Sequence, residues 1–384
     1  MTLIPGGEAG FASVSCSPSP RTRLNLVAGL PQVVVWKAAG GPGFSRVIEA
    51  FGMPDADAGH AFEAGRLAKA DLTTDMVREF TELQGTMGGI YAREEGLPEE
   101  VWKAIYLHYL PLGVEADAPP SRAQLGKAVR TWTAVSLADK LDTVVGLFAA
   151  GEKPTGSRDP YGIRRAAQGV IKILTDFSGS GHAAEIPVGL SQMIEEAFKN
   201  LAGALKKVDD SWRAALGEFF AERAMNIFER RGFRPDEIRA VVPRHWAQPS
   251  DALRRVEALA RARRSTEFQV LATLFKRVKN ISKGFDDAFD SAHAARLVEP
   301  SEVALLKALE AKQPAIDQAL SRDEYEVAMR ELGDLSAPVD RFFTDVLVMA
   351  EDPSVRQARL ALLTFLRRTI LNIADIAEVA PEQS

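Results

Sequence analysis

The sequence is poor in the residue types on which covalent and metal chemistry depends. Its 384 residues include one cysteine, Cys16, and five histidines. A single cysteine excludes an internal disulfide framework and fits a reducing cytoplasm. The sequence contains no His-Asp dipeptide, no phosphate-binding P-loop and no G-x-S-x-G nucleophile motif. We therefore expect no catalytic residue, no metal ligands and no cofactor site on this chain.

Long apolar runs are missing as well. The best candidate, Leu24 to Trp36, is interrupted by Pro31 and Gln32 and falls short of the roughly 20 residues that a membrane helix needs. A secretory signal is not convincing, because Arg21 and Arg23 follow a Ser/Pro stretch instead of preceding an apolar core. We expect a cytoplasmic protein without a membrane segment.

Sustained strand alternation is absent, and apolar residues recur at steps of three and four, which is the helical period. Two stripes show the pattern: Leu216, Phe220, Ala224 and Ile227, and Phe268, Leu271, Phe275 and Val278. The sequence therefore predicts an all-α fold. Residues 1–43 are rich in Gly, Ser and Pro and are expected to be poorly ordered. Val241 to Ser250, with its two prolines, is the expected linker before the last helical bundle.

Three arginines crowd the expected start of a helix at Asp159–Pro160. Arg158, Arg164 and Arg165 lie beside a Gly-Ser loop, and Asp159 is a candidate N-cap. Cations oppose the helix dipole at this end, so the cluster predicts an anion site that suits a phosphate. The alternative is that these arginines pair with nearby carboxylates: Asp139, Asp142 or Glu152.

The net charge of −5 hides a local contrast. Residues 251–283 hold nine Lys/Arg against three Asp/Glu, a net charge of +6. Residues 284–384 hold ten against nineteen, a net charge of −9. Such a basic block in an acidic protein predicts a localised anion-binding surface. The alternative, a solvated helical face, is the usual role of charge runs. RNA is one polyanion that an anion-binding surface of this kind could bind through its phosphates. The residues expected to contact it are Arg254, Arg255, Arg264, Lys276, Arg277, Lys279 and Lys283.

Several blocks closely resemble one known family. They are RLAKADLTTDMVREFTELQG from Arg66, IYLHYLP from Ile105, ADKLDT from Ala138, PTGSRDPYGIRRAAQGV from Pro154, FKRVKNI from Phe275 and FFTDVLVMAEDPSVRQARLALL from Phe342. In this order they resemble the β subunit of the bacterial two-subunit glycyl-tRNA synthetase. The resemblance runs from about residue 44 to about residue 378 and covers only the C-terminal half of that longer subunit.

The resemblance implies four segments: an atypical start at 1–43, an HD-like helical domain at 44–160, a helical connector at 161–250 and a DALR-type anticodon-binding domain at 251–384. An active HD domain holds metal with a His, a His-Asp pair and a distant Asp. Only the distant element survives, as Asp139 in LADKLD, and Lys69–Asp71 offers no histidine. His108 lies on an apolar helical face and is interpreted as a packed core residue.

The resemblance also implies a function. The family attaches glycine to its tRNA at the expense of ATP, with the chemistry on a separate α subunit in an α2β2 assembly. ATP and Mg²⁺ are then expected on the α subunit, and tRNA(Gly) on this chain. Two alternatives stay open: an HD phosphohydrolase, which the missing His-Asp pair opposes, and a free-standing RNA-binding module derived from the synthetase.

Overall fold

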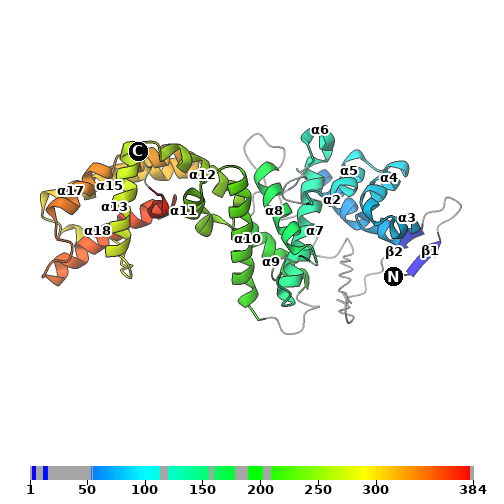
Figure 1. Cartoon of the computed structure of the whole chain (residues 1–384), viewed down its shortest axis with the longest axis horizontal. Coiled ribbons are helices and arrows are strands. Elements are labelled where there is room, and N and C mark those ends of the chain that lie inside the picture. The colour runs from blue at the N-terminus through cyan, green and yellow to red at the C-terminus, as the bar shows by residue number, and fades with distance from the viewer. Residues whose placement is uncertain are drawn as a thin grey trace. The chain divides into compact units, whose positions relative to one another are not determined.

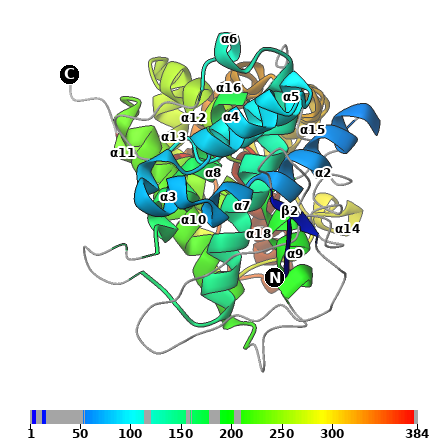
Figure 2. The same ribbon diagram turned by 90° about the vertical axis from the view of Figure 1, so that its right-hand side faces the viewer.

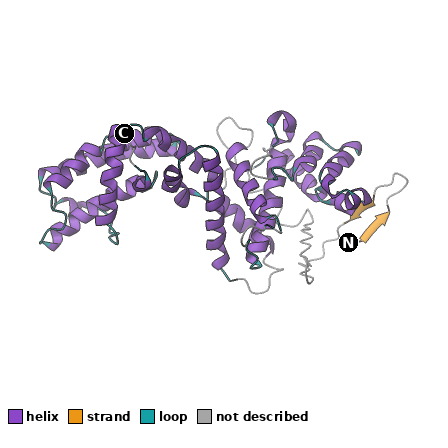
Figure 3. Cartoon of the chain, in the orientation of Figure 1, coloured by secondary structure: helices purple, strands orange, loops and turns teal. Residues whose placement is uncertain are grey.

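The structure is a computed structural model that describes residues 2–5, 12–15, 53, 55–112, 120–154, 159, 161–177, 189–201 and 209–380. The chain forms two compact units, unit 1 at Met1–Arg223 and unit 2 at Ala224–Ser384. Helices dominate both units (Figure 3), which confirms the predicted all-α fold. The exception is a small antiparallel ladder in which β1 (Thr2–Pro5) pairs with β2 (Ala12–Ser15). The four predicted segments stay a prediction, and no helix among the described residues has the length and apolarity to cross a membrane.

Unit 1 is a cluster of helices (Figure 1). Its helical elements are α2 (Asp55–Leu67), η1 (Ala70–Thr73), α3 (Asp75–Glu79), η2 (Thr81–Leu83), α4 (Thr86–Glu94), α5 (Glu99–Leu107), α6 (Arg122–Leu125), η3 (Gly126–Ala128), α7 (Val129–Ala149), α8 (Ile163–Phe177) and α9 (Leu190–Leu201). The long helix α10 (Ser211–Arg230) begins in unit 1 and ends in unit 2.

Helix α7 is the core of unit 1. It packs against α2, α5, α8 and α9, while α4 lies along α5 (Figure 2). Its apolar residues point to several sides, so Trp132, Leu137 and Leu141 are all fully buried. A helix that is apolar all round is a buried helix. The indole Nε1 of Trp132 donates a hydrogen bond to the Leu107 carbonyl at 2.9 Å and fixes α7 against the end of α5.

Unit 2 is a bundle arranged around one helix. Its elements are α11 (Pro235–His245), α12 (Pro249–Ala262), α13 (Thr266–Ile281), α14 (Ser291–Ala294), α15 (Pro300–Ser321), α16 (Tyr325–Gly333), α17 (Ser336–Asp345), α18 (Pro353–Leu371) and η4 (Ile376–Glu378). Helix α13 packs against α16, α17, α18 and η4. The inward face predicted for it is confirmed, since Phe268, Leu271, Phe275 and Val278 are at most 1% exposed.

The predicted linker at residues 241–250 is wrong in its first half. Val241 and Val242 are fully buried in α11, which continues to His245 despite Pro243. A proline in the last turn removes only one backbone hydrogen bond, and burying two valines outweighs that loss. The connection between α11 and α12 is therefore short. It consists of Trp246, Ala247 and Gln248.

Candidate functional site

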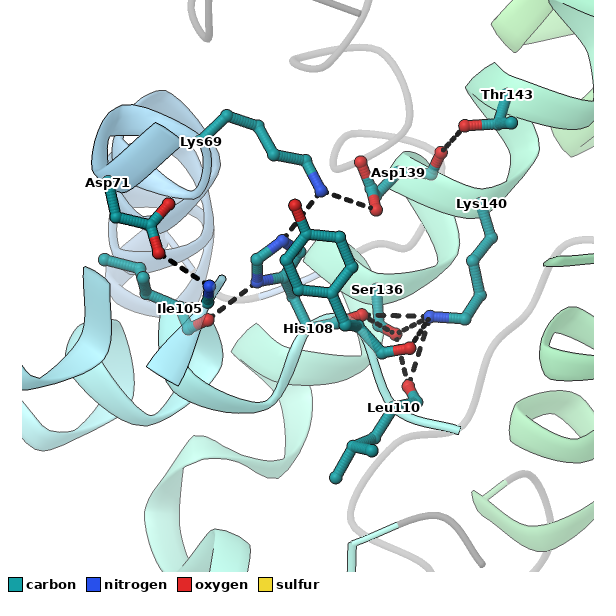
Figure 4. A network of polar contacts seen from close by, with 11 residues as sticks. Lys69, Asp71, Ile105, His108, Leu110, Ser136, Asp139, Lys140 and Thr143 are labelled. Atoms are coloured by element: carbon teal, nitrogen blue, oxygen red, sulfur yellow. Dashed lines mark hydrogen bonds and ion pairs between the residues drawn. The ribbon is translucent and has the colours of Figure 1, made fainter. Parts of the chain in front are cut away.

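The side chain of Lys69 lies at the centre of a polar cluster in unit 1 (Figure 4). Its Nζ lies 2.8 Å from His108 Nε2 and donates to Asp139 Oδ2 at 3.0 Å. It also lies 3.7 Å from the centroid of the Tyr109 ring. These groups come from the loop after α2, the end of α5 and the middle of α7. An imidazole nitrogen and a carboxylate oxygen, both common metal ligands, thus converge on an ammonium group.

The hydrogen bonds decide the charge of each group in this cluster. His108 Nδ1 lies 2.6 Å from the Ile105 carbonyl, which only accepts, so Nδ1 carries the proton and Nε2 is free to accept from Lys69. Burial and the nearby Lys69 charge lower the pKa of His108 to about 3, which keeps the ring neutral. Burial alone would lower the pKa of Lys69, but Asp139 and Tyr109 raise it above its usual value. Burial would raise the pKa of Asp139, yet the Lys69 charge keeps it low.

A second lysine, Lys140, binds the backbone at the end of α5. Its Nζ donates to the carbonyls of His108, Tyr109 and Leu110 at 2.9 to 3.2 Å and to Ser136 Oγ at 2.9 Å. Burial lowers the pKa of Lys140 to about 7. Four acceptors around one nitrogen nevertheless favour the ammonium form, since a neutral amine has only two hydrogens to donate. Lys140 therefore holds the loop that carries His108.

The cluster in unit 1 joins the end of α5 to α7 through Lys69. Within the described residues, no group of three or more His, Cys, Asp and Glu side chains is placed to hold a metal ion. His108 and Asp139 both contact Lys69, which lies between them. The interpretation of His108 as a packed core residue matches its full burial, although the sequence did not reveal its polar partner.

The predicted phosphate site at the start of α8 already holds an anion. Asp159 Oδ1 accepts from the Arg164 amide at 3.1 Å, and Oδ2 accepts from the Arg165 amide at 3.3 Å. Arg165 Nε also lies 3.5 Å from Asp159 Oδ2. A phosphate would have to displace this carboxylate, and Arg158 lies outside the described residues. The phosphate site stays a prediction and has no part in the function proposed below.

Three of the seven arginines and lysines predicted to bind RNA form side-chain hydrogen bonds or ion pairs within unit 2. Arg255 binds Asp251 at 2.7 Å and the carbonyls of Asn372 and Ile373. Arg254 binds Asp323 at 3.1 Å, and Lys279 binds Asp375 at 2.6 Å. These contacts join the basic block to the acidic segment that follows it.

The other four are exposed. Lys276, Arg277 and Lys283 lie along one side of α13 and its C-terminal end, and Arg264 lies just before the helix. The spacing of α13 places a run of exposed residues on one strip, because they recur at steps of three and four. We call this strip the α13 outer stripe, and it consists of Thr273, Lys276, Arg277, Asn280 and Lys283.

Sequence reasoning missed the roles of Lys69 and Lys140, the two lysines of the unit 1 cluster. Lys140 lies three residues after Leu137 and four before Val144, on the buried side of α7. A cation at such a position is a signal of a buried ammonium, because lysine is almost never fully buried without partners. Lys69 gives no comparable signal. Its partners lie 39 and 70 residues away in the sequence.

Comparison with known proteins agrees with this architecture. The model of the glycyl-tRNA synthetase beta subunit family matches residues 44–243, and the model of the DALR anticodon binding domain matches residues 272–383. The second match contains Lys276, Arg277 and Lys283 of the α13 outer stripe. The first contains the whole Lys69 cluster.

Three relatives, each a glycine–tRNA ligase beta subunit, illustrate the similarity. The protein of Acidithiobacillus ferrooxidans is 37% identical over 328 residues, which are 84% of this chain and 45% of the relative. That of Chromohalobacter salexigens is 39% identical over 324 residues, which are 84% of this chain and 45% of the relative. That of Methylobacillus flagellatus is 36% identical over 369 residues, which are 94% of this chain and 50% of the relative. The chain thus spans about half the length of these relatives, and it belongs to the glycyl-tRNA synthetase β-subunit family.

Proposed function

We propose that this chain is the tRNA-binding part of the β subunit of glycine–tRNA ligase. It binds tRNA(Gly) through unit 2 and supports the ATP-dependent attachment of glycine in the cytoplasm. The chemistry belongs to a separate α subunit, which binds ATP and Mg²⁺ in an α2β2 assembly.

The observation that carries the proposal is the α13 outer stripe. Lys276 lies in α13, and Lys283 lies two residues after the last residue of that helix, Ile281. Neither side chain has a hydrogen-bond or ion-pair partner among the described residues. Exposed ammonium groups without a carboxylate partner are available to phosphates, and contacts of this kind supply most of the salt-dependent affinity for nucleic acid.

The test is a filter-binding titration of glycine tRNA at several salt concentrations with the full chain. Replacing both lysines, Lys276→Ala with Lys283→Ala, should weaken binding and flatten the dependence of log K on log salt. If each lysine neutralises one phosphate, the slope should fall by roughly one to two units. Circular dichroism should stay unchanged, because both side chains point to solvent.

The matched control removes two other cations of unit 2, Lys307→Ala with Arg330→Ala. Both are exposed and have no partner among the described residues. The two double variants have the same net charge, so a slope that falls equally in both would contradict a localised surface.

Glycylation assays with added α subunit test the other half of the proposal, the assignment of the chemistry to that subunit. Tight tRNA binding without any effect of the α subunit would favour the free-standing RNA-binding module.

A further inference from the structure

The guanidinium group of Arg277, on the α13 outer stripe, stands over an aromatic ring. Its guanidinium carbon is 4.3 Å from the centroid of the Phe343 ring on α17. Phe343 is 7% exposed and stands edge-on to Phe342, with ring centroids 5.5 Å apart and planes at 71°. Phe342 is fully buried. The ring beneath Arg277 is therefore held in place by the core, and the guanidinium stands over it.

Arg277 differs from every other arginine stacked on an aromatic ring in the described part of the chain. Those arginines each pair with a carboxylate: Arg93 with Glu94, Arg213 with Glu195 and Asp210, Arg223 with Glu222, and Arg255 with Asp251. Arg277 is exposed and has no hydrogen-bond or ion-pair partner among the described residues. Its outer face and its N–H groups are therefore available to a ligand.

A guanidinium in this state suits a flat, polar ligand. Unpaired RNA bases stack on arginine planes and aromatic rings, and their edges bind nearby donors and acceptors. Asn280 follows three residues later on the same stripe and offers both a donor and an acceptor. Lys276 and Lys283 lie on the same stripe and would hold the adjoining phosphates.

We propose that Arg277, supported by Phe343, is a stacking platform for one unpaired base of the bound RNA, while Lys276 and Lys283 bind its backbone. This inference rests on the proposed tRNA binding and assigns Arg277 a distinct role in that binding. Because the guanidinium already rests over the Phe343 ring, less side-chain freedom is lost when a base covers it than for an arginine without such a contact. The platform favours a single-stranded loop over a duplex, whose stacked bases expose no face.

The test is Arg277→Lys, which keeps the charge and removes the plane. Binding is measured for glycine tRNA, for an unpaired oligonucleotide and for a blunt RNA duplex. For the first two RNAs, affinity should fall roughly 5- to 100-fold, the range of one lost stacking contact. The salt slope should stay unchanged, and duplex binding should be unaffected.

The conservative control is Arg330→Lys, the same exchange at an exposed arginine of α16 outside the α13 outer stripe, and it should leave all three affinities within about twofold. If Arg277 only neutralises a phosphate, Arg277→Lys will bind every RNA like the wild type, and the platform is disproved while the proposed function survives. A salt slope unchanged by replacing Lys276 and Lys283 with Ala would instead reject the proposed surface. A chain that binds none of the three RNAs overturns both.

Discussion

A single glycine allows Lys140 to reach the carbonyls at the end of α5. A Cβ on Gly169 of α8 would lie 2.6 Å from Lys140 Cε and 3.2 Å from the Pro111 carbonyl oxygen. The lysine is held by four hydrogen bonds at its tip, so it cannot move aside without losing some of them. The close approach of α7 and α8 thus requires a residue without a side chain at position 169.

We expect Gly169→Ala to destabilise the protein. Alanine gains about 1 kcal/mol of helix propensity over glycine, but overpacking against a fixed side chain costs about 1–3 kcal/mol and breaks part of the Lys140 network. The net loss should be about 1–2 kcal/mol in urea unfolding. Gly59→Ala in α2 is the control, because a Cβ there meets nothing within 4 Å and should stabilise by up to about 1 kcal/mol. A stabilised Gly169→Ala would show that Lys140 is mobile.

Individual residues also show where sequence reasoning reached its limit. The apolar faces could be predicted, because helical periodicity alone determines which side is buried, as for Phe275 and Val278. The partners of charged residues could not, because Lys69 and Asp139 meet only after the chain has folded. The same limit applied to the basic block, where Arg255 and Arg264 look alike in the sequence but only Arg255 has internal partners.

Among the elements, α11, α12 and the end of the chain are joined by Arg263. Its side chain is 4% exposed and binds Glu237 at 2.8 Å, Asp236 at 3.2 Å and the Ala380 carbonyl at 3.0 Å. The Ala380 amide in turn donates to Asp236 Oδ2 at 2.8 Å. One buried cation thus serves two carboxylates on the first turn of α11.

We expect Arg263→Met to destabilise unit 2 by about 3–5 kcal/mol, because two carboxylates would lose their cation in a buried place. The neighbour supplies the control. Arg264→Met removes an exposed side chain without a partner among the described residues and should change stability by at most about 0.5 kcal/mol. Chemical denaturation of both variants makes the comparison. Equal losses would mean that the Arg263 contacts do not persist in solution.

For the whole molecule, the division into two compact units predicts more than one unfolding step. Unit 1 and unit 2 meet in sequence within α10, between Arg223 and Ala224. Calorimetry should resolve two transitions, since chains with several compact units seldom unfold as one. Gly169→Ala should lower one of them by roughly 3–6 °C, and Arg263→Met should lower the other by roughly 10 °C. A single transition that both variants shift would contradict the division.

The ammonium of Lys69 has one consequence for how this protein is handled beside RNA. A bound metal is exchanged with the surrounding pool, and its site empties when that pool is depleted. The cation between His108 and Asp139 is the side chain of Lys69, so it cannot dissociate from the protein as a bound metal ion can. If the chain binds tRNA as proposed, magnesium can be varied or chelated during the binding experiment while the contacts of Lys69 with His108 and Asp139 stay in place.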